Sequence, residues 1–356
     1  MIYNYLLSIL ISFILAVFIT PFIKKAGLKY NITDIPGEPR KIQSQPTPLL
    51  GGLTIYFSFL IALLISLSFG WLNDGIIQTN QILAIILGGF IIVIIGFFDD
   101  KYNIRTKSFV GPFLAAILAV ALGITVTYIT NPFMAGTGPY GRSLFYFSGA
   151  IGHIFSFFWL LGMMYTTKFL DGLDGLVTGI GATGAIILFI VSLFWDVPQS
   201  GTSILALILA GSCLGFLIYN FHPAKIFLGE SGSVFIGFML GVLSIISGAK
   251  IATALLIMGI PILDVVWVIL RRIFKEHKSP FAGDDKHLHF RLLQVGFSHR
   301  AAVLFLYLLT IIFGTSSLFL QSQYKVIALI ILIVSMLILA ASLAVMYNKK
   351  TNEKKF

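Results

Sequence analysis

Apolar runs of about 18 residues or more recur along the whole chain and are separated by short polar segments. A helix of that length spans the ~30 Å hydrocarbon core of a bilayer. The pattern predicts about eleven such helices, near residues 4–23, 50–70, 81–98, 109–130, 150–167, 175–195, 202–219, 233–249, 251–270, 301–320 and 325–346. We therefore expect an all-α, polytopic integral membrane protein in which residues 1–356 form a single transmembrane domain.

The charged residues are few and are divided unevenly between the two sides of the predicted helices. They make up 11% of the chain, against 58% hydrophobic residues, which is atypical of a soluble domain. If the N-terminus lies outside, every Lys and Arg except Arg142, Lys250 and Lys325 falls on the inside. This bias predicts an outside N-terminus and a cytoplasmic C-terminus in the cell membrane. The net charge of +10 is then a sign of topology and indicates no nucleic-acid partner.

Residues suited to catalysis gather in the loops that are predicted to be cytoplasmic. These loops lie at about 24–49, 99–108, 168–174, 220–232 and 271–300, whereas the outside loops contain mainly turn-forming residues. Their ionisable residues include Asp99 and Asp100 in GFFDDK, Asp171 and Asp174 in KFLDGLDG, Glu230 in FLGESGS, and His287 and His289 in HLHFRLL. We therefore expect an active site at the cytoplasmic face.

Each acidic motif also has a purely structural explanation. Asp99 and Asp100 could simply end the third span, and Asp171, Asp174 or a serine beside Glu230 could cap the next helix. Adjacent carboxylates repel one another, however, and this raises the pKa of one of them unless a cation lies between them. Two acids three residues apart at a helix start share one face, although one cap needs a single Asp. The acids together favour a site for a divalent cation and a phosphate-bearing ligand.

The longest and most basic inside loop contains two histidines. His287 and His289 lie two residues apart, which predicts an extended segment with both rings on one side. Lys286 and Arg291 flank them, and neither a cysteine nor a helical HxxxH spacing accompanies them. The pattern favours a phosphate clamp over a transition-metal site.

Two other features lie at or inside the predicted spans. Asp264 lies about two turns before the inner end of the ninth span, where a carboxylate is a functional candidate, and Arg271 or Arg272 is its expected partner. The segment QPTPLLGG, residues 45–52, predicts a stiff turn into a closely packed second span.

The motifs resemble, in order, those of the polyprenyl-phosphate N-acetylhexosamine-1-phosphate transferases, which are of the glycosyltransferase family 4 type. The matching strings run from about residue 40 to residue 300 and are RKIQSQPTPLLGG, GFFDDK with Lys107 downstream, FLDGLDGL, NFHPAKIFLGESGS and HLHFRLL. Five strings in one order are far more specific than any one of them. The H-x-H spacing before Arg-Leu-Leu, and PILD before Arg271 and Arg272, resemble the GlcNAc-1-phosphate branch, whereas Phe290 resembles the MurNAc-pentapeptide branch.

The resemblance implies ten or eleven spans and a definite reaction. The family transfers N-acetylhexosamine-1-phosphate, here GlcNAc-1-phosphate by the branch resemblance, from a UDP-sugar to undecaprenyl or another polyprenyl phosphate. UMP is released, and a lipid-linked envelope glycan such as a lipopolysaccharide O-antigen or a teichoic acid is initiated. The resemblance implies Mg²⁺ as cofactor, with Mn²⁺ as an alternative, and leaves a homodimer open. It assigns Asp99, Asp100, Asp171 and Asp174 to catalysis, Asp100 and Glu230 to the metal, and Lys107, Lys168, Asn220, His287, His289 and Arg291 to substrate binding.

Three positions depart from the family pattern. Members usually carry Asp, Asn and His where this chain has Glu230, Lys168 and Gln43. A charged lysine cannot ligate a metal. Because a cation stands at one of the first two positions and a longer carboxylate at the other, we expect Lys168 and Glu230 to form an ion pair that partly replaces the usual metal seat.

Three other interpretations stay open at this point. A phospho-MurNAc-pentapeptide transferase would use the same motifs. A transporter of phosphorylated solutes would also place ionisable residues among its spans, but near the midplane and commonly with a repeated half. A family member without activity is suggested by Lys168 and Glu230 and opposed by the four aspartates of the two DD and DGLD motifs.

Overall fold

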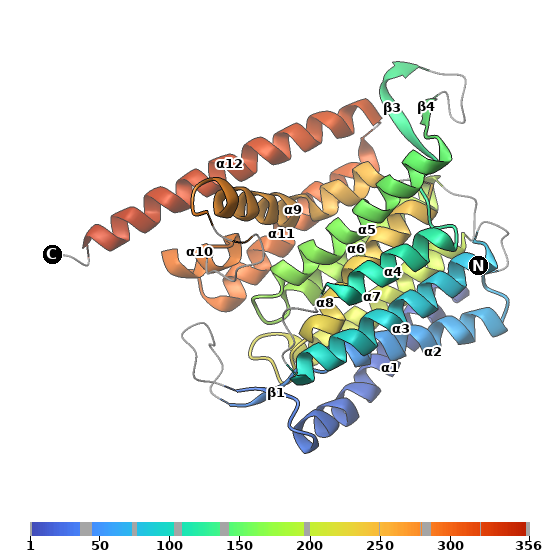
Figure 1. The fold of residues 1–356 in the computed structure, drawn as a ribbon, viewed down its shortest axis with the longest axis horizontal. Helices are drawn as coiled ribbons and strands as arrows, with labels where there is room; N and C mark the ends of the chain where they lie inside the picture. Colours follow the sequence, from blue (N-terminus) through green and yellow to red (C-terminus); the bar gives the residue numbers. More distant parts are fainter. Residues whose placement is uncertain are drawn as a thin grey trace.

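The computed structural model describes residues 2–35, 45–72, 77–102, 109–135, 142–195, 200–248, 250–277, 279, 286–320 and 322–353. Over these residues the protein is a bundle of long helices with two small antiparallel two-stranded sheets (Figure 1). Ten of the described helices are long and apolar enough to cross a membrane. The all-α, multi-pass membrane fold expected from the sequence is therefore confirmed.

The elements follow one another along the chain as helices joined by loops and by two pairs of short strands. The long helices are α1 (Ile2–Lys29), α2 (Gly51–Ser68), α3 (Thr79–Tyr102), α5 (Gly149–Leu170), α6 (Leu176–Trp195), α7 (Gly201–Asn220), α8 (Gly229–Ile246), α9 (Ile251–Phe274), α11 (His299–Phe319) and α12 (Ser322–Glu353). The shorter helices are α4 (Val110–Ala121) and α10 (Leu288–Val295), and the paired strands are β1 (Thr33–Asp34) with β2 (Thr47–Pro48), and β3 (Tyr128–Ala135) with β4 (Arg142–Tyr146).

Helix α4 is shorter than the span predicted at 109–130. Its 12 residues extend ~18 Å, well below the thickness of a bilayer core. The helix ends at Ala121, and Gly123 follows with φ +92°, a left-handed conformation that glycine tolerates at helix ends. The chain then continues in extended form into β3. In the described part of the chain, the eleven predicted spans thus correspond to ten long helices and this short one.

The centre of the bundle is formed by α7 and α8. In their apolar stretches 83% and 89% of the residues are buried, against 22% in α1 and α12. The outer helices leave large apolar side chains such as Phe18 and Phe22 exposed. Such surfaces are unfavourable in water, and a surrounding bilayer removes that cost. The burial pattern therefore separates a protein-packed centre from a lipid-facing rim.

Glycines bring α2 and α3 very close to the start of α8. The Gly52 N–H donates to the carbonyl of Leu228 at 2.9 Å, and a Cβ on Gly52 would overlap the backbone nitrogen of Gly232. A Cβ on Gly96 of α3 would lie 2.6 Å from Cα of Ser231. The close packing predicted for the second span is confirmed. Its consequence is that α2 and α3 together fix the position of the first turn of α8.

Candidate functional site

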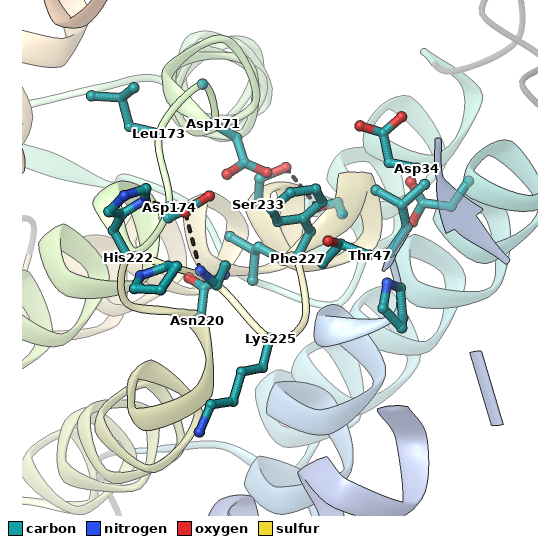
Figure 2. A pocket seen from close by; sticks show the side chains of 18 of the residues that line it. Asp34, Thr47, Asp171, Leu173, Asp174, Asn220, His222, Lys225, Phe227 and Ser233 are labelled. Atoms are coloured by element: carbon teal, nitrogen blue, oxygen red, sulfur yellow. Dashed lines mark hydrogen bonds and ion pairs between the residues drawn. The ribbon is translucent and has the colours of Figure 1, made fainter. Parts of the chain in front are cut away.

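A cavity of about 970 Å³ opens at one end of the bundle, where α3, α5 and α7 end and α6 and α8 begin (Figure 2). Its volume is in the range of small-molecule sites. Five carboxylates line it, namely Asp34, Asp100, Asp171, Asp174 and Glu230. Acids from three separate sequence motifs therefore reach one cavity. Lysines also line it: Lys24, Lys168 and Lys225.

Asp99, Asp100, Asp171 and Glu230 form what we call the acidic cluster. The Glu230 carboxyl group lies beside that of Asp99, and Asp100 is close enough to Asp99 and Asp171 to interact with their charges. The Oδ1 atom of Asp99 is buried without a hydrogen-bond partner among the described residues. The carboxylates of the cluster repel one another, and a bound cation would reduce that repulsion.

Asp100 caps helix α8 from a neighbouring helix. Its Oδ1 accepts a hydrogen bond from the Glu230 backbone N–H at 3.1 Å. The residue before α8, Leu228, has no side chain that could do so. The alternative that a serine caps this helix is wrong, because the Ser233 hydroxyl donates back to the Gly229 carbonyl at 3.1 Å. The positive end of α8 thus holds a carboxylate of α3.

Lys168 and Glu230 form the ion pair expected from the sequence. Lys168 lies in the last turn of α5 and Glu230 in the first turn of α8. The Lys168 Nζ and Glu230 Oε1 atoms are 2.6 Å apart, and the two side chains are 19% and 16% exposed. A pair so far removed from water is held more firmly than a surface pair.

Asp171 and Asp174 lie in a turn between α5 and α6 rather than at the start of a helix. The expectation that they share a helix face is therefore wrong; Gly175, with φ +80°, turns the chain before α6 begins at Leu176. Both acids nevertheless line the cavity. Asp171 is open to the cavity, yet partial removal from water and the charge of Asp174 raise its pKa.

Beside Asp174 the cavity is lined by two histidines that the sequence analysis did not single out, His222 and His299. Asp174 Oδ2 lies 2.7 Å from His222 Nδ1 and accepts the Ala224 N–H at 3.1 Å. The His222 and His299 rings stack with their centres 3.9 Å apart. We call Asp174, His222 and His299 the histidine wall; Figure 2 shows Asp174 beside His222. His222 lies inside the NFHPAKIFLGESGS string, whereas no local pattern marks His299.

The histidine wall has the residue types of a metal site, because one ligand atom from each residue lies within 4.8 Å of the others. The nearly parallel stacking of the two rings, at 14°, favours a different use. Both nitrogens of His299 are buried and have no hydrogen-bond partner among the described residues, and His222 Nδ1 already faces Asp174. The two rings line the cavity and are suited to packing against a planar ligand.

Asn220 lines the cavity but uses both ends of its side chain within the protein. Its Oδ1 accepts from the Thr178 hydroxyl at 2.8 Å, and its Nδ2 donates to the Ile226 carbonyl at 3.0 Å. The side chain is buried. Its visible role is to hold α6, the end of α7 and the loop before α8 together.

His287 and His289 lie behind the cavity wall. His287 precedes α10 and His289 lies within it, so the extended segment predicted for this pair is wrong. The reason is Asp264 of α9, whose carboxylate lies 2.8 Å from His287 Nδ1 and accepts the Leu288 N–H at 2.8 Å, which supports the start of α10. His289 packs against Gly172, and burial lowers its pKa to about 3.

The remaining candidates take other partners or lie beyond the described residues. Asp264 bonds to the start of α10 and not to the expected arginines, and Arg271 forms an ion pair with Glu276 at 3.1 Å. Arg291 donates to the Lys286 carbonyl at 3.0 Å on an exposed surface. Lys107 and Gln43 lie outside the described residues.

The acidic cluster has the chemistry of a Mg²⁺ site. Mg²⁺ is held by carboxylate oxygens and keeps several waters, which an open cavity allows. Two observations indicate that a cation would stabilise this cluster. The buried Oδ1 of Asp99 has no hydrogen-bond partner among the described residues, and Glu230 already binds the ammonium of Lys168. The residues fit the cofactor, with Asp100, Asp171 and Glu230 as the cluster members that line the cavity.

Ten membrane-length helices with an acid-lined cavity where their ends meet define a polytopic membrane protein with a polar ligand site at one end. Residues 82–248 match the sequence model of glycosyl transferase family 4. The chain is 32% identical over 348 residues to the probable undecaprenyl-phosphate N-acetylglucosaminyl 1-phosphate transferase of Bacillus subtilis (strain 168), with 94% of this chain and 90% of the relative covered. The chain belongs to glycosyl transferase family 4, as the motifs indicated.

Two further relatives show the breadth of the family. The decaprenyl-phosphate N-acetylglucosaminephosphotransferase of Mycolicibacterium smegmatis is 32% identical over 330 residues, with 85% of this chain and 79% of the relative covered. The phospho-N-acetylmuramoyl-pentapeptide-transferase of Oceanobacillus iheyensis is 27% identical over 326 residues, with 89% and 97% covered. The similarity is therefore greater to these GlcNAc-phosphate relatives.

Proposed function

We propose that this protein transfers GlcNAc-1-phosphate from UDP-GlcNAc to undecaprenyl or another polyprenyl phosphate at the cytoplasmic membrane face, with release of UMP. The acidic cluster at the bottom of a ligand-sized cavity is the observation that carries the proposal. The names of the relatives support the sugar and the lipid acceptor. The distribution of Lys and Arg supports the cytoplasmic side. The product would initiate a lipid-linked envelope glycan.

In this reaction an oxygen of the lipid phosphate attacks the β-phosphorus of the nucleotide sugar. The bond from that phosphorus to the oxygen bridging the two phosphates breaks, and UMP leaves with the bridging oxygen. Such a step depends on positioning and on charge neutralisation. We expect Asp99 or Asp100, at the end of α3, to accept the proton of the attacking phosphate.

The other residues of the cavity bind and orient. Asp100, Asp171 and Glu230 would hold a Mg²⁺ or Mn²⁺ ion, which spreads the charge of the diphosphate when it is bound. The histidine wall and the nearby Phe227 offer aromatic faces and hydrogen-bonding groups to a nucleotide base. Lys168 supplies positive charge beside the cluster.

Transfer of phospho-MurNAc-pentapeptide is the second candidate, favoured by the 97% of the Oceanobacillus iheyensis relative that this chain covers. A transporter is disfavoured, because the acids of the cavity lie at the helix ends and not halfway along them.

The test is the release of UMP by purified protein that is given undecaprenyl phosphate, Mg²⁺ and one of several UDP-sugars. UMP from UDP-GlcNAc, together with a lipid-linked sugar phosphate, is expected, and Asp171→Asn serves as the control for a contaminating enzyme. UMP from UDP-MurNAc-pentapeptide alone would favour the second candidate. No UMP from any donor would contradict the transferase assignment.

A further inference from the structure

Lys168 brings an amino group into the acidic cluster from the side of α5. Its ammonium group lies 2.6 Å from Glu230, and both side chains are largely buried while they still line the cavity. Glu230 also lies beside Asp99, and its backbone N–H binds Asp100. The ammonium of Lys168 therefore occupies a position beside Glu230 that a metal ion bound by these carboxylates would also take.

One ammonium does not balance the cluster. Four carboxylates lie in it, and Asp100 interacts with the charges of both Asp99 and Asp171. The buried Oδ1 of Asp99 has no hydrogen-bond partner among the described residues. Residual negative charge of this kind attracts a divalent cation, since hard cations prefer carboxylate oxygens.

A divalent cation and the ammonium cannot both take the same oxygen of Glu230. Like charges a few ångströms apart repel one another far more strongly in a partly buried site than in water. A cation entering from the cavity therefore has to drive Lys168 away from Glu230. The long lysine side chain can turn without moving the helix, because it carries four rotatable bonds.

We propose that Lys168 is an internal counter-ion that competes with a divalent cation for Glu230. In the ligand-free protein the ammonium holds the carboxylate. When the cation binds, Lys168 turns into the cavity and meets the anionic part of the ligand, so one charge serves two partners in succession. The proposal rests on the proposed function only for the identity of that anion as a diphosphate.

Binding of Mn²⁺, followed by electron paramagnetic resonance, tests the competition directly. The full-length protein is purified in detergent and titrated with Mn²⁺ alone, without nucleotide or lipid. Lys168→Met removes the charge and keeps most of the side-chain volume. We expect its Mn²⁺ affinity to rise about tenfold or more, because the cation no longer displaces a partly buried ion pair. An affinity equal to or below that of the unchanged protein would overturn the proposal.

Two matched variants control for general effects of charge and for folding. Lys225→Met removes a lysine that lines the same cavity but is exposed, and it should leave the Mn²⁺ affinity unchanged. An equal gain in both Met variants would contradict a specific competition at Glu230. Lys168→Arg keeps the charge and should bind Mn²⁺ as weakly as the unchanged protein. Thermal unfolding of each variant establishes that it is folded.

The competition and the transfer reaction can fail separately. If Lys168→Met binds Mn²⁺ more tightly but the unchanged protein releases no UMP from any donor, the transferase assignment is refuted and the counter-ion proposal stands. Normal UMP release with equal Mn²⁺ affinities would refute the counter-ion and keep the transferase.

Discussion

The acidic cluster and the histidine wall both place carboxylates in one cavity, but they balance the negative charge differently. On the histidine wall, Asp174 is paired with His222 and with a backbone N–H, so the protein itself satisfies it. In the acidic cluster, four carboxylates are close to one ammonium, and Asp99 keeps a buried oxygen without a partner among the described residues. The difference indicates that the histidine wall is a preformed binding surface. The acidic cluster, by contrast, is stabilised by added cations and is suited to phosphoryl chemistry.

The largest effect is expected from neutralising the end of α3. Asp99→Asn or Asp100→Asn should lower turnover by about 10²–10⁴-fold, the usual contribution of a general base. The proteins should remain folded, because a neutral amide relieves repulsion in the cluster. UMP release at saturating substrates measures the effect, and thermal unfolding provides the control. Near-normal rates in both variants would remove the pair from the mechanism.

The next effect concerns the ion pair. Lys168→Asn should lower activity because Glu230 loses its partner, at a cost of about 3–5 kcal/mol when a buried partner is fully removed. Glu230→Asp should lower activity because the shorter carboxylate no longer reaches the Lys168 ammonium. The double variant should recover much of the activity and depend more strongly on Mg²⁺. A double-mutant cycle on kcat/KM measures the coupling. Effects that simply add would show that the two residues act independently.

A smaller effect should follow from crowding the start of α8, which carries Glu230 but no residue of the histidine wall. Gly52→Ala places a methyl group against the backbone of Gly232 and should destabilise the fold by about 1–3 kcal/mol. Gly162→Ala is the matched control, because a Cβ there meets nothing within 4 Å. Thermal unfolding measures both. Equal midpoints would mean that the crossing of α2 and α8 is less tight than described.

The smallest effect links the two regions through the pH dependence of the reaction. Partial desolvation and the charge of Asp174 raise the pKa of Asp171, so Asp171 takes up its proton at a higher pH than a free aspartate. If Asp171 acts as a carboxylate, activity falls as the pH drops through that raised pKa. Asp174→Asn removes the repulsion and should move the acid limb of the kcat/KM profile to lower pH. If the acid limb of the profile does not move, the charge of Asp174 does not influence the protonation of Asp171.

Much of the fold was predictable because a membrane span is defined by the apolar composition of a continuous segment of the sequence. The run lengths located every long helix, with ends that differ from the structure by at most seven residues, and α4 ends early at a glycine turn that hydropathy does not register. The start of α10 was missed for a different reason. It depends on Asp264, a carboxylate on another helix, and no local pattern reports a cap supplied from a distance.

The site was predictable where a residue pattern by itself specified a chemical need. The acids of the DD, DGLD and GES strings were expected at one face, and all of them except Asp99 line one cavity. The unusual residues Lys168 and Glu230 predicted their ion pair. His299 could not be predicted, because it reaches Asp174 only through the packing of α11. The placement of Asp171 likewise depends on the turn between α5 and α6, and the prediction from helical spacing was therefore wrong.

The division of labour between the acidic cluster and the histidine wall is tested most directly by measuring binding and turnover on the same two variants. Equilibrium binding of UDP-GlcNAc and the rate of UMP release are determined for Asp100→Asn and Asp174→Asn. The account predicts that Asp100→Asn binds the nucleotide sugar but turns it over at least about a hundredfold more slowly. Asp174→Asn should bind more weakly and keep most of its turnover at saturation. Lost binding in Asp100→Asn with intact binding in Asp174→Asn would contradict the account.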